Sequence, residues 1–240
     1  MKLAILNRNF YGMPLVGEKK KKFFEFLSLQ TANKLHFEEA GKCICGQPNG
    51  QKIASCDRFG FPVGSYLCQA CGLIHLSPRL TEDSLPLFYD QLYWGLVVGK
   101  NSELSDDTLT TGGEGYGADV AAFVEKFFFG KQKIKIAEIG LGNGQKLMSL
   151  KEHFDSKNIQ TELYGCDFSS EAVNVCKQKG IKAFQGYFDT LAPYGPFDLV
   201  IMSHVVEHLN DPVLVLKNVS KILGDSGYLY VEVPGVGELD

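Results

Sequence analysis

The stretch IAEIGLGNGQK, residues 136–146, decides the fold. A short apolar run ends in an acidic residue, and glycines follow at alternate positions, Gly140, Gly142 and Gly144. Glycine permits a tight turn there and lets the backbone approach a ligand closely. A dinucleotide fingerprint, G-x-G-x-x-G, requires its third glycine one position later, where this chain has Gln145. The spacing therefore argues against a nicotinamide-dependent oxidoreductase, and it leaves an ordinary tight turn as a further alternative.

Strand and helix patterns alternate from Lys131 onward. Two of the apolar runs are hydrophobic nearly throughout, which is typical of strands buried on both faces. We therefore expect an α/β fold, a mostly parallel sheet with helices on both faces. The expected strands are 134–140, 162–167, 181–186, 197–203 and 227–234, and the expected helices are 119–129, 145–154, 169–180 and 211–223.

Polar residues follow two of these strands. Asp167 ends the second strand, where a carboxylate can accept hydrogen bonds from both hydroxyls of a ribose. It can instead serve the positive end of the helix that follows. The segment SHVVEH, residues 203–208, follows the fourth strand. Ligands of open α/β sheets bind at this carboxyl edge, so we expect the functional site there.

The segments AEIGLGNGQ, GCD, FDLVIMSHVVEHLNDP and GYLYVEVP together resemble a class I S-adenosylmethionine (SAM)-dependent methyltransferase over roughly residues 115–240. The resemblance implies a Rossmann-like methyltransferase domain. Such a sheet has two more strands after the fifth, so we expect a sheet that is cut short or a chain that is a fragment. The residues that this resemblance assigns to the cofactor are Glu138, Gly140, Gly142 and Gly144 at the methionine half, Asp167 at the ribose, Phe168 and Gln185 near the adenine, and Ser203 beside the sulfonium.

The chemistry of the cofactor agrees with this reading. SAM has no pyrophosphate, so its loop needs no glycine spaced for one. SAM carries a sulfonium cation and a zwitterionic amino acid. Acidic side chains and backbone groups are suited to bind these charged parts. Residues 185–188 would border the adenine, although Tyr187 and Phe188 can equally belong to the core.

Methyl transfer needs an aligned acceptor and, for an oxygen or carbon acceptor, removal of a proton. His204 and His208 are the candidate bases, because histidine titrates near neutral pH. His204 follows the strand directly and lies nearer the expected reaction point, and Glu207 can orient either ring. In some related families such a Glu and His bind magnesium, and His208 can also be purely structural. Tyr116 is a candidate lid residue in the glycine-rich loop 99–118.

Five of the seven cysteines lie between residues 36 and 80. Two close pairs, separated by 22 residues, can converge on one tetrahedral ion, and thiolates bind zinc tightly in closed structural sites. We expect Zn²⁺ to be held by Cys43, Cys45, Cys68 and Cys71. Cys56 can replace Cys43, and free cysteines in a small β subdomain are the alternative.

The cysteine-rich segment and the following SPRLTEDSLPLFYDQLYW resemble the lead-in of bacterial sugar and secondary-metabolite methyltransferases, including C-methyltransferases that act on nucleotide-linked deoxysugars. The resemblance then covers roughly residues 40–240, and it implies a small-molecule acceptor. The expected organisation is an N-terminal segment, 1–35, a zinc module, 36–80, a helical linker with a lid-like loop, 81–118, and a SAM-binding domain, 119–240.

Charge and hydropathy exclude several classes of protein. The net charge of −4 gives no basic excess for nucleic acid or an anionic membrane. No segment reaches the length of a bilayer span, and the N-terminus is too interrupted for a signal peptide, so we expect a cytoplasmic protein. A non-catalytic zinc-containing scaffold and an RNA methyltransferase stay open as alternatives. The sequence does not predict the oligomeric state.

Overall fold

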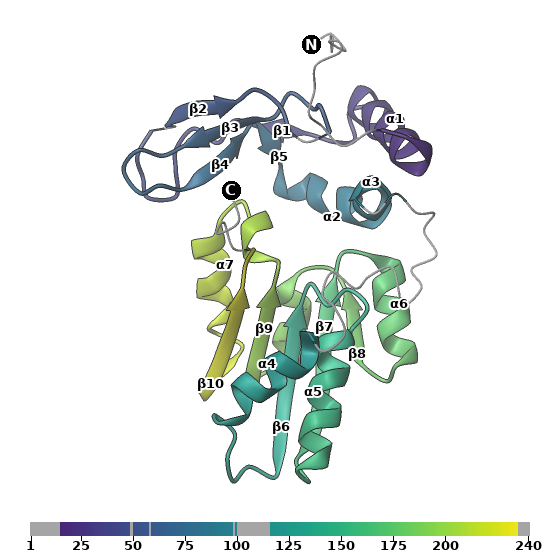
Figure 1. Cartoon of the computed structure of the whole chain (residues 1–240), viewed down its shortest axis with the longest axis vertical. Coiled ribbons are helices and arrows are strands. Elements are labelled where there is room, and N and C mark those ends of the chain that lie inside the picture. The colour runs from purple at the N-terminus through teal and green to yellow at the C-terminus, as the bar shows by residue number, and fades with distance from the viewer. Residues whose placement is uncertain (1–14, 49, 58, 98, 100–115, 235–240) are drawn as a thin grey trace. The chain divides into compact units, whose positions relative to one another are not determined.

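The computed structural model describes residues 15–48, 50–57, 59–97, 99 and 116–234 (Figure 1). The chain divides into two compact units. The first comprises Met1–Phe88 and Leu92–Asn101, and the second comprises Tyr89–Gln91 and Ser102–Asp240. The four segments expected from the sequence, with their boundaries, stay predictions.

A five-stranded parallel sheet forms the second unit, with the order β10-β9-β6-β7-β8. Chain order runs from the central strand β6 first to one side and then to the other, so the carboxyl ends of β6 and β9 meet at a topological switch point. This confirms the predicted parallel sheet. The strands are β6 Lys133–Ile139, β7 Gln160–Asp167, β8 Lys182–Gln185, β9 Phe197–Ser203 and β10 Leu223–Glu232.

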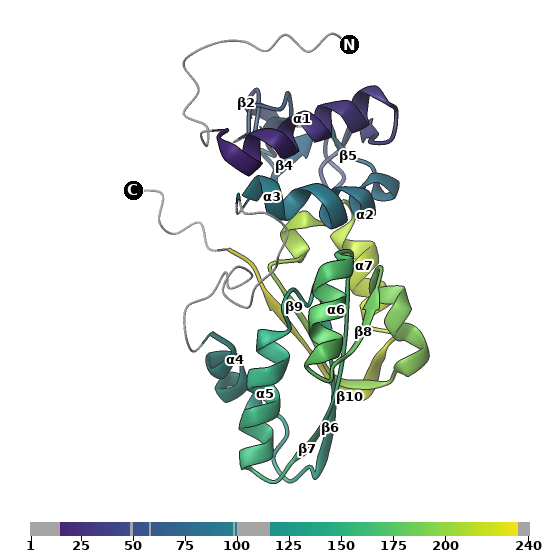
Figure 2. The same cartoon turned by 90° about the vertical axis from the view of Figure 1, so that its right-hand side faces the viewer.

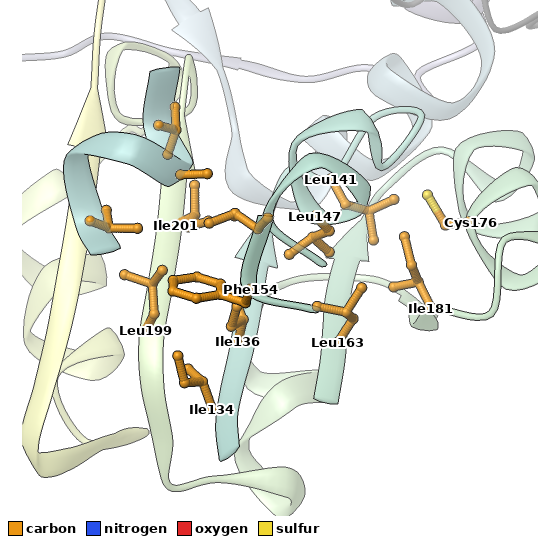
Figure 3. Packing of buried hydrophobic residues seen from close by; sticks show 14 of the residues in the cluster. Ile134, Ile136, Leu141, Leu147, Phe154, Leu163, Cys176, Ile181, Leu199 and Ile201 are labelled. Carbon is orange, nitrogen blue, oxygen red and sulfur yellow. The ribbon is translucent and has the colours of Figure 1, made fainter. Parts of the chain in front are cut away.

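Helices cover both faces of this sheet, as the sequence predicts (Figures 1 and 2). One core lies beneath α4 Tyr116–Glu125, α5 Gln145–Ser156 and α6 Ser170–Gln178. Figure 3 shows its packing, in which Phe154 lies close to Ile136 and Leu199. The opposite core lies beneath the 3-10 helix η3 Phe188–Tyr194 and the helix α7 Pro212–Val219.

Two element boundaries differ from the sequence-based expectation. β10 begins at Leu223 rather than at residue 227, so the preceding helix, expected to reach residue 223, ends at Val219. The carbonyl of Ile222 accepts the Phe197 N–H at 2.8 Å, which brings the chain onto β9 early, and the register then shifts before Tyr228. The helix expected at 119–129 spans 116–125, because tight turns follow Glu125.

The first unit has its own aromatic core. Phe61 stacks on Phe23 at 4.8 Å and lies 4.1 Å from Phe26, between ring centroids. Leu92 and Leu96 complete this core from the irregular helical segment that the sequence predicts after Thr81. The elements of the unit are α1 Gly17–Thr31, β1 Phe37–Glu38, β2 Gln51–Ala54, β3 Gly64–Leu67, β4 Ile74–Ser77, β5 Arg79–Leu80, η1 Glu82–Ser84, α2 Leu85–Phe88, the π-helix η2 Tyr89–Tyr93, which the two units share, and α3 Trp94–Val97.

Strands β2, β3 and β4 form an antiparallel sheet, and β1 pairs with β5. Among the described residues, no helix combines the length and the apolar character needed to cross a bilayer.

Two neighbouring phenylalanines test the core assignment. Phe128 is 1% exposed, whereas Phe129 is 97% exposed. We expect Phe128→Ala to lower the free energy of unfolding by about 3–5 kcal/mol, since it removes a buried ring and leaves a cavity. The matched Phe129→Ala variant should change it by less than about 0.5 kcal/mol. Urea unfolding of both variants measures the difference, and equal effects would contradict the packing described here.

Candidate functional site

The three loop glycines share a backbone conformation, but their surroundings differ. All are left-handed, with φ of 73° at Gly140, 52° at Gly142 and 73° at Gly144. A Cβ at Gly140 would lie 2.6 Å from Val205, and one at Gly144 would lie 2.6 Å from Ile181. At Gly142 no described atom lies within 4 Å of that position. The left-handed φ favours glycine at all three positions, and packing is a second constraint at Gly140 and Gly144. Among the described residues, Gly142 is the point at which the loop leaves room for a ligand.

Glu138 lies at the end of β6, and its side chain is 1% exposed. Its Oε1 atom is 3.6 Å from Lys146 Nζ, and its Oε2 atom has no hydrogen-bond partner among the described residues. Burial raises the pKa of Glu138 to about 7, and the positive charge of Lys146 opposes this rise. A buried oxygen without a partner costs free energy, so this position is suited to a donor that a ligand would bring.

Asp167 fixes the glycine loop. Its Oδ2 accepts the Gly142 N–H at 3.0 Å, and its Oδ1 accepts the Ser169 N–H at 2.9 Å. Burial raises the pKa of Asp167, and these backbone donors oppose the rise. A carboxylate oxygen can accept more than one hydrogen bond, so each oxygen of Asp167 can also accept a hydrogen bond from a ribose hydroxyl. The predicted ribose contact stays a prediction.

The residues predicted near the adenine lie together after β7 and β8. The rings of Phe168 and Tyr187 stack with centroids 5.5 Å apart and planes 10° apart. Gln185 Nε2 donates to the Phe168 carbonyl at 3.0 Å. Tyr187 and Phe188 also pack against the core beneath α7, so these aromatic residues line the edge of the core rather than its interior.

The carboxylate of Glu207 lies between two imidazole rings. Its Oε1 atom is 3.5 Å from His204 Nδ1 and 3.8 Å from His208 Nε2. The side chains of His204 and His208 are 37% and 39% exposed, so both can exchange protons with solvent or a ligand. His204 has a φ of 54°, a left-handed conformation that is uncommon outside glycine and that clusters at functional sites. The segment therefore holds a carboxylate that can stabilise either ring when it is protonated.

Glu232 is a polar residue at this edge that the sequence analysis missed. It ends β10 in register with Ser203, and Ser203 Oγ donates to its Oε2 at 2.8 Å. Its carbonyl accepts the His204 N–H at 2.9 Å. The sequence did indicate this residue, because it is a glutamate near the end of the apolar strand GYLYVEVP. The contact with Ser203 could not be predicted, because the two residues are far apart in the sequence.

The predicted lid lies largely outside the described residues. α4 begins at Tyr116, but the side chain of Tyr116 is also outside them.

The predicted metal ligands meet in the first unit. The Sγ atoms of Cys43, Cys45, Cys68 and Cys71 all lie within 4.8 Å of one another, and Cys56 is not part of this cluster. The Cys43–Cys71 and Cys45–Cys68 sulfur distances are both 3.6 Å. A tetrahedral zinc ion with Zn–S bonds of about 2.3 Å sets its sulfurs about 3.8 Å apart, so the cluster fits such an ion.

Two similar turns present the thiols. The Gly46 N–H donates to the Cys43 carbonyl and the Gly72 N–H to the Cys68 carbonyl, both at 2.8 Å. Backbone N–H groups of Cys71 and Ala70 lower the pKa of Cys68 to about 6, whereas burial and the neighbouring thiols raise the pKa values of Cys43 and Cys71. The thiolate is the form that binds metal. The shorter spacing of the first cysteine pair therefore does not prevent the two turns from converging. By contrast, Cys166 and Cys176 are buried in the second unit.

Comparison with known proteins agrees with this geometry. Residues 137–231, from β6 to β10, match the family model of a methyltransferase domain. No curated protein sequence matches the chain. The plantazolicin methyltransferase BpumL, solved with a substrate analogue and S-adenosylhomocysteine (SAH), is 20% identical over 47% of this chain and 44% of that chain, with a TM-score of 0.40. SAM-bound CalS10, an amino pentose methyltransferase from Micromonospora echinaspora, is 19% identical over 51% of each chain, with a TM-score of 0.41.

The chain thus spans about half the length of these solved proteins. Likeness at this level carries no information about the acceptor. The observed sheet confirms the predicted α/β fold, and residues 137–231 within it match the methyltransferase-domain model.

The buried carboxyl of Glu138 predicts a pH-dependent stability. Its pKa is raised from 4.5 to about 7, so the folded state binds more protons than the unfolded state between these values. The free energy of unfolding therefore falls as pH rises from 4.5 to 7. Glu138→Gln lacks this ionisation, and without ligand we expect it to exceed the wild type in stability by on the order of 3 kcal/mol at about pH 8.5.

Urea unfolding at about pH 4.5 and about pH 8.5 measures this difference. The advantage of Glu138→Gln should disappear at the lower pH, where the wild-type carboxyl is protonated in the folded state. A difference that stays constant between the two pH values would show that Glu138 is not the group responsible.

Proposed function

We propose that this chain is a SAM-dependent methyltransferase that methylates a small molecule. The observation that carries the proposal lies within the matched methyltransferase domain: a buried carboxyl with one unpartnered oxygen, Glu138, at the start of a glycine loop that is open at Gly142. Bound SAM would supply an activated methyl group at its sulfonium.

The residues at the sheet edge have separate roles toward this cofactor. Glu138 would accept hydrogen bonds from the ammonium of the cofactor's amino acid, because Oε2 is buried and the described residues offer it no donor. Gly142 would let the backbone approach the methionine half, between the packed glycines Gly140 and Gly144. Asp167 would hold the ribose hydroxyls, and Phe168 and Gln185 would border the adenine.

The histidine segment would serve the acceptor. His204 would take the proton from an acceptor hydroxyl or carbon acid, and Glu207 would orient and stabilise the resulting imidazolium. His208 shares the same carboxylate and is the second candidate. Ser203 would lie beside the sulfonium, held by its hydrogen bond to Glu232.

The proposed acceptor class is a nucleotide-linked sugar or a related metabolite. The support is the resemblance of the cysteine-rich segment and its helical lead-in to methyltransferases of sugar and secondary-metabolite pathways. Between His36 and Arg79 the sequence has four Lys or Arg and three acidic residues, so no basic surface favours RNA.

Titration calorimetry with SAH, and with NAD in parallel, tests the cofactor. We expect one-to-one binding of SAH with a Kd on the order of micromolar and no binding of NAD. His204→Asn should bind SAH as the wild type does, because His204 is assigned to the acceptor side. Asparagine tolerates the left-handed backbone that His204 adopts, so this variant isolates the ring.

Each alternative outcome has a definite meaning. Binding of NAD would favour the oxidoreductase. A folded protein that binds neither ligand would contradict the proposed function and favour a non-catalytic scaffold. A loss of SAH binding in His204→Asn would move this histidine from the acceptor to the cofactor.

We also propose a structural Zn²⁺ in the first unit, held by Cys43, Cys45, Cys68 and Cys71. The mutual sulfur distances and the two similar turns support it. Four thiolates leave no open position on the ion, so it would stabilise the fold rather than take part in the reaction.

Metal analysis of protein purified without added zinc tests this site. We expect about one zinc per chain in the wild type, and less than half of that in Cys68→Ser, which loses one of four ligands. Cys56→Ser is the matched control and should keep its zinc, since Cys56 lies outside the cluster. Wild-type protein with less than half an equivalent, and with a melting temperature unchanged by a chelator, would contradict the proposal.

A further inference from the structure

Lys146 occupies an unfavourable position for a cation. It is the second residue of α5, at the positive end of the helix dipole, where a positive charge is destabilising. Its side chain is nevertheless only 15% exposed, and its Nζ atom lies 3.6 Å from Glu138 Oε1. The helix therefore holds a largely buried ammonium beside a fully buried carboxyl.

The geometry of this ion pair is poor for stability. The distance of 3.6 Å exceeds that of a good hydrogen bond, and Glu138 Oε2 has no partner among the described residues. A buried ion pair offsets the loss of hydration only when its geometry is excellent and its remaining polar atoms are satisfied. The pair therefore leaves hydrogen-bonding capacity that a ligand can use.

The backbone of α4 packs closely on the first turn of α5. A Cβ atom added at Gly117 of α4 would lie 2.5 Å from the Ser149 side chain and 3.2 Å from Lys146 Cα. The glycine loop, which is open at Gly142 among the described residues, leads directly into this turn.

We propose that Lys146 binds the carboxylate of the cofactor's amino acid while Glu138 binds its ammonium, so that the buried pair recognises the zwitterion. This inference rests on the proposed function, and it names a specificity-determining residue within it. In an α-amino acid the nitrogen and the carboxyl carbon are about 2.5 Å apart, so both charges can meet a lysine and a glutamate that are close together. The positive end of α5 also favours the carboxylate there.

Binding would satisfy the buried carboxyl. Glu138 Oε2 would gain a donor, which it lacks among the described residues, and the ligand carboxylate would lie near Lys146 at the positive end of α5. A nucleoside without the amino acid would not change the hydrogen bonding of the Glu138–Lys146 pair.

A comparison of two ligands with the purified chain tests this assignment. SAH carries both charges, and its decarboxylated analogue keeps the adenosine, the sulfur and the amine. We expect the wild type to bind SAH at least 10-fold more tightly than the analogue, because a charge-assisted hydrogen bond is lost. Lys146→Met should weaken SAH binding by about 10- to 100-fold and change binding of the analogue by less than about 3-fold.

Lys151→Met is the matched control. Lys151 lies on the same helix with an exposed side chain and pairs with Asp155, so neither ligand should be affected. If Lys146→Met fails to fold, the double variant Glu138→Gln with Lys146→Met removes both buried charges. Its preference for SAH over the analogue should fall to less than about 5-fold, which is what the helix dipole alone provides.

Three results would overturn the inference: equal binding of the two ligands by the wild type, unchanged SAH binding in a folded Lys146→Met variant, or an equal loss for both ligands. The last result would mean that Lys146 only neutralises Glu138. If the folded wild type binds neither ligand, the proposed cofactor itself is wrong, which is a separate outcome.

Discussion

The structure of the second unit depends on one tight turn, in which three left-handed glycines connect β6 to α5. Gly140 admits the Val205 side chain, and Gly144 admits Ile181. Gly142 is tied by its N–H to Asp167 on the neighbouring strand. The turn therefore joins strands β6, β7 and β9 at their carboxyl ends. A side chain at Gly140 would displace Val205, and one at Gly144 would displace Ile181 and Cys176, in addition to the strain of the left-handed backbone.

The alternation of apolar strands and helices was enough to predict this fold, because parallel strands buried on both faces leave a strong sequence pattern. The pattern also placed the polar strand ends, and the spacing of the cysteines separately predicted that the two pairs would meet. It could not separate the two glycines required by packing from the open Gly142, since all three have the same spacing. It also missed Glu232 and Lys146, whose partners are distant in sequence and lie on other elements.

Burial explains why carboxyls at one sheet edge can differ in chemistry. Glu138 is almost fully enclosed, and its pKa is raised to about 7 by the loss of hydration. Glu207 lies between two half-exposed imidazoles and keeps contact with solvent. The first carboxyl is suited to a fixed ligand charge, and the second to contact with the two imidazole rings. Under the proposed function, the same edge of the sheet would separate cofactor binding from acceptor chemistry.

The first unit faces a different constraint, because its small sheet has little core of its own. All four residues of β2 are exposed, and the aromatic core around Phe61 is built mainly with helical residues. The turns at Cys43 and Cys68 are nevertheless held with their sulfurs together. Hydrophobic burial from this sheet is too small to fix such loops, and small modules of this kind depend on a cross-link or a metal. Four thiolates on one ion would provide that link at the place where apolar contacts are missing.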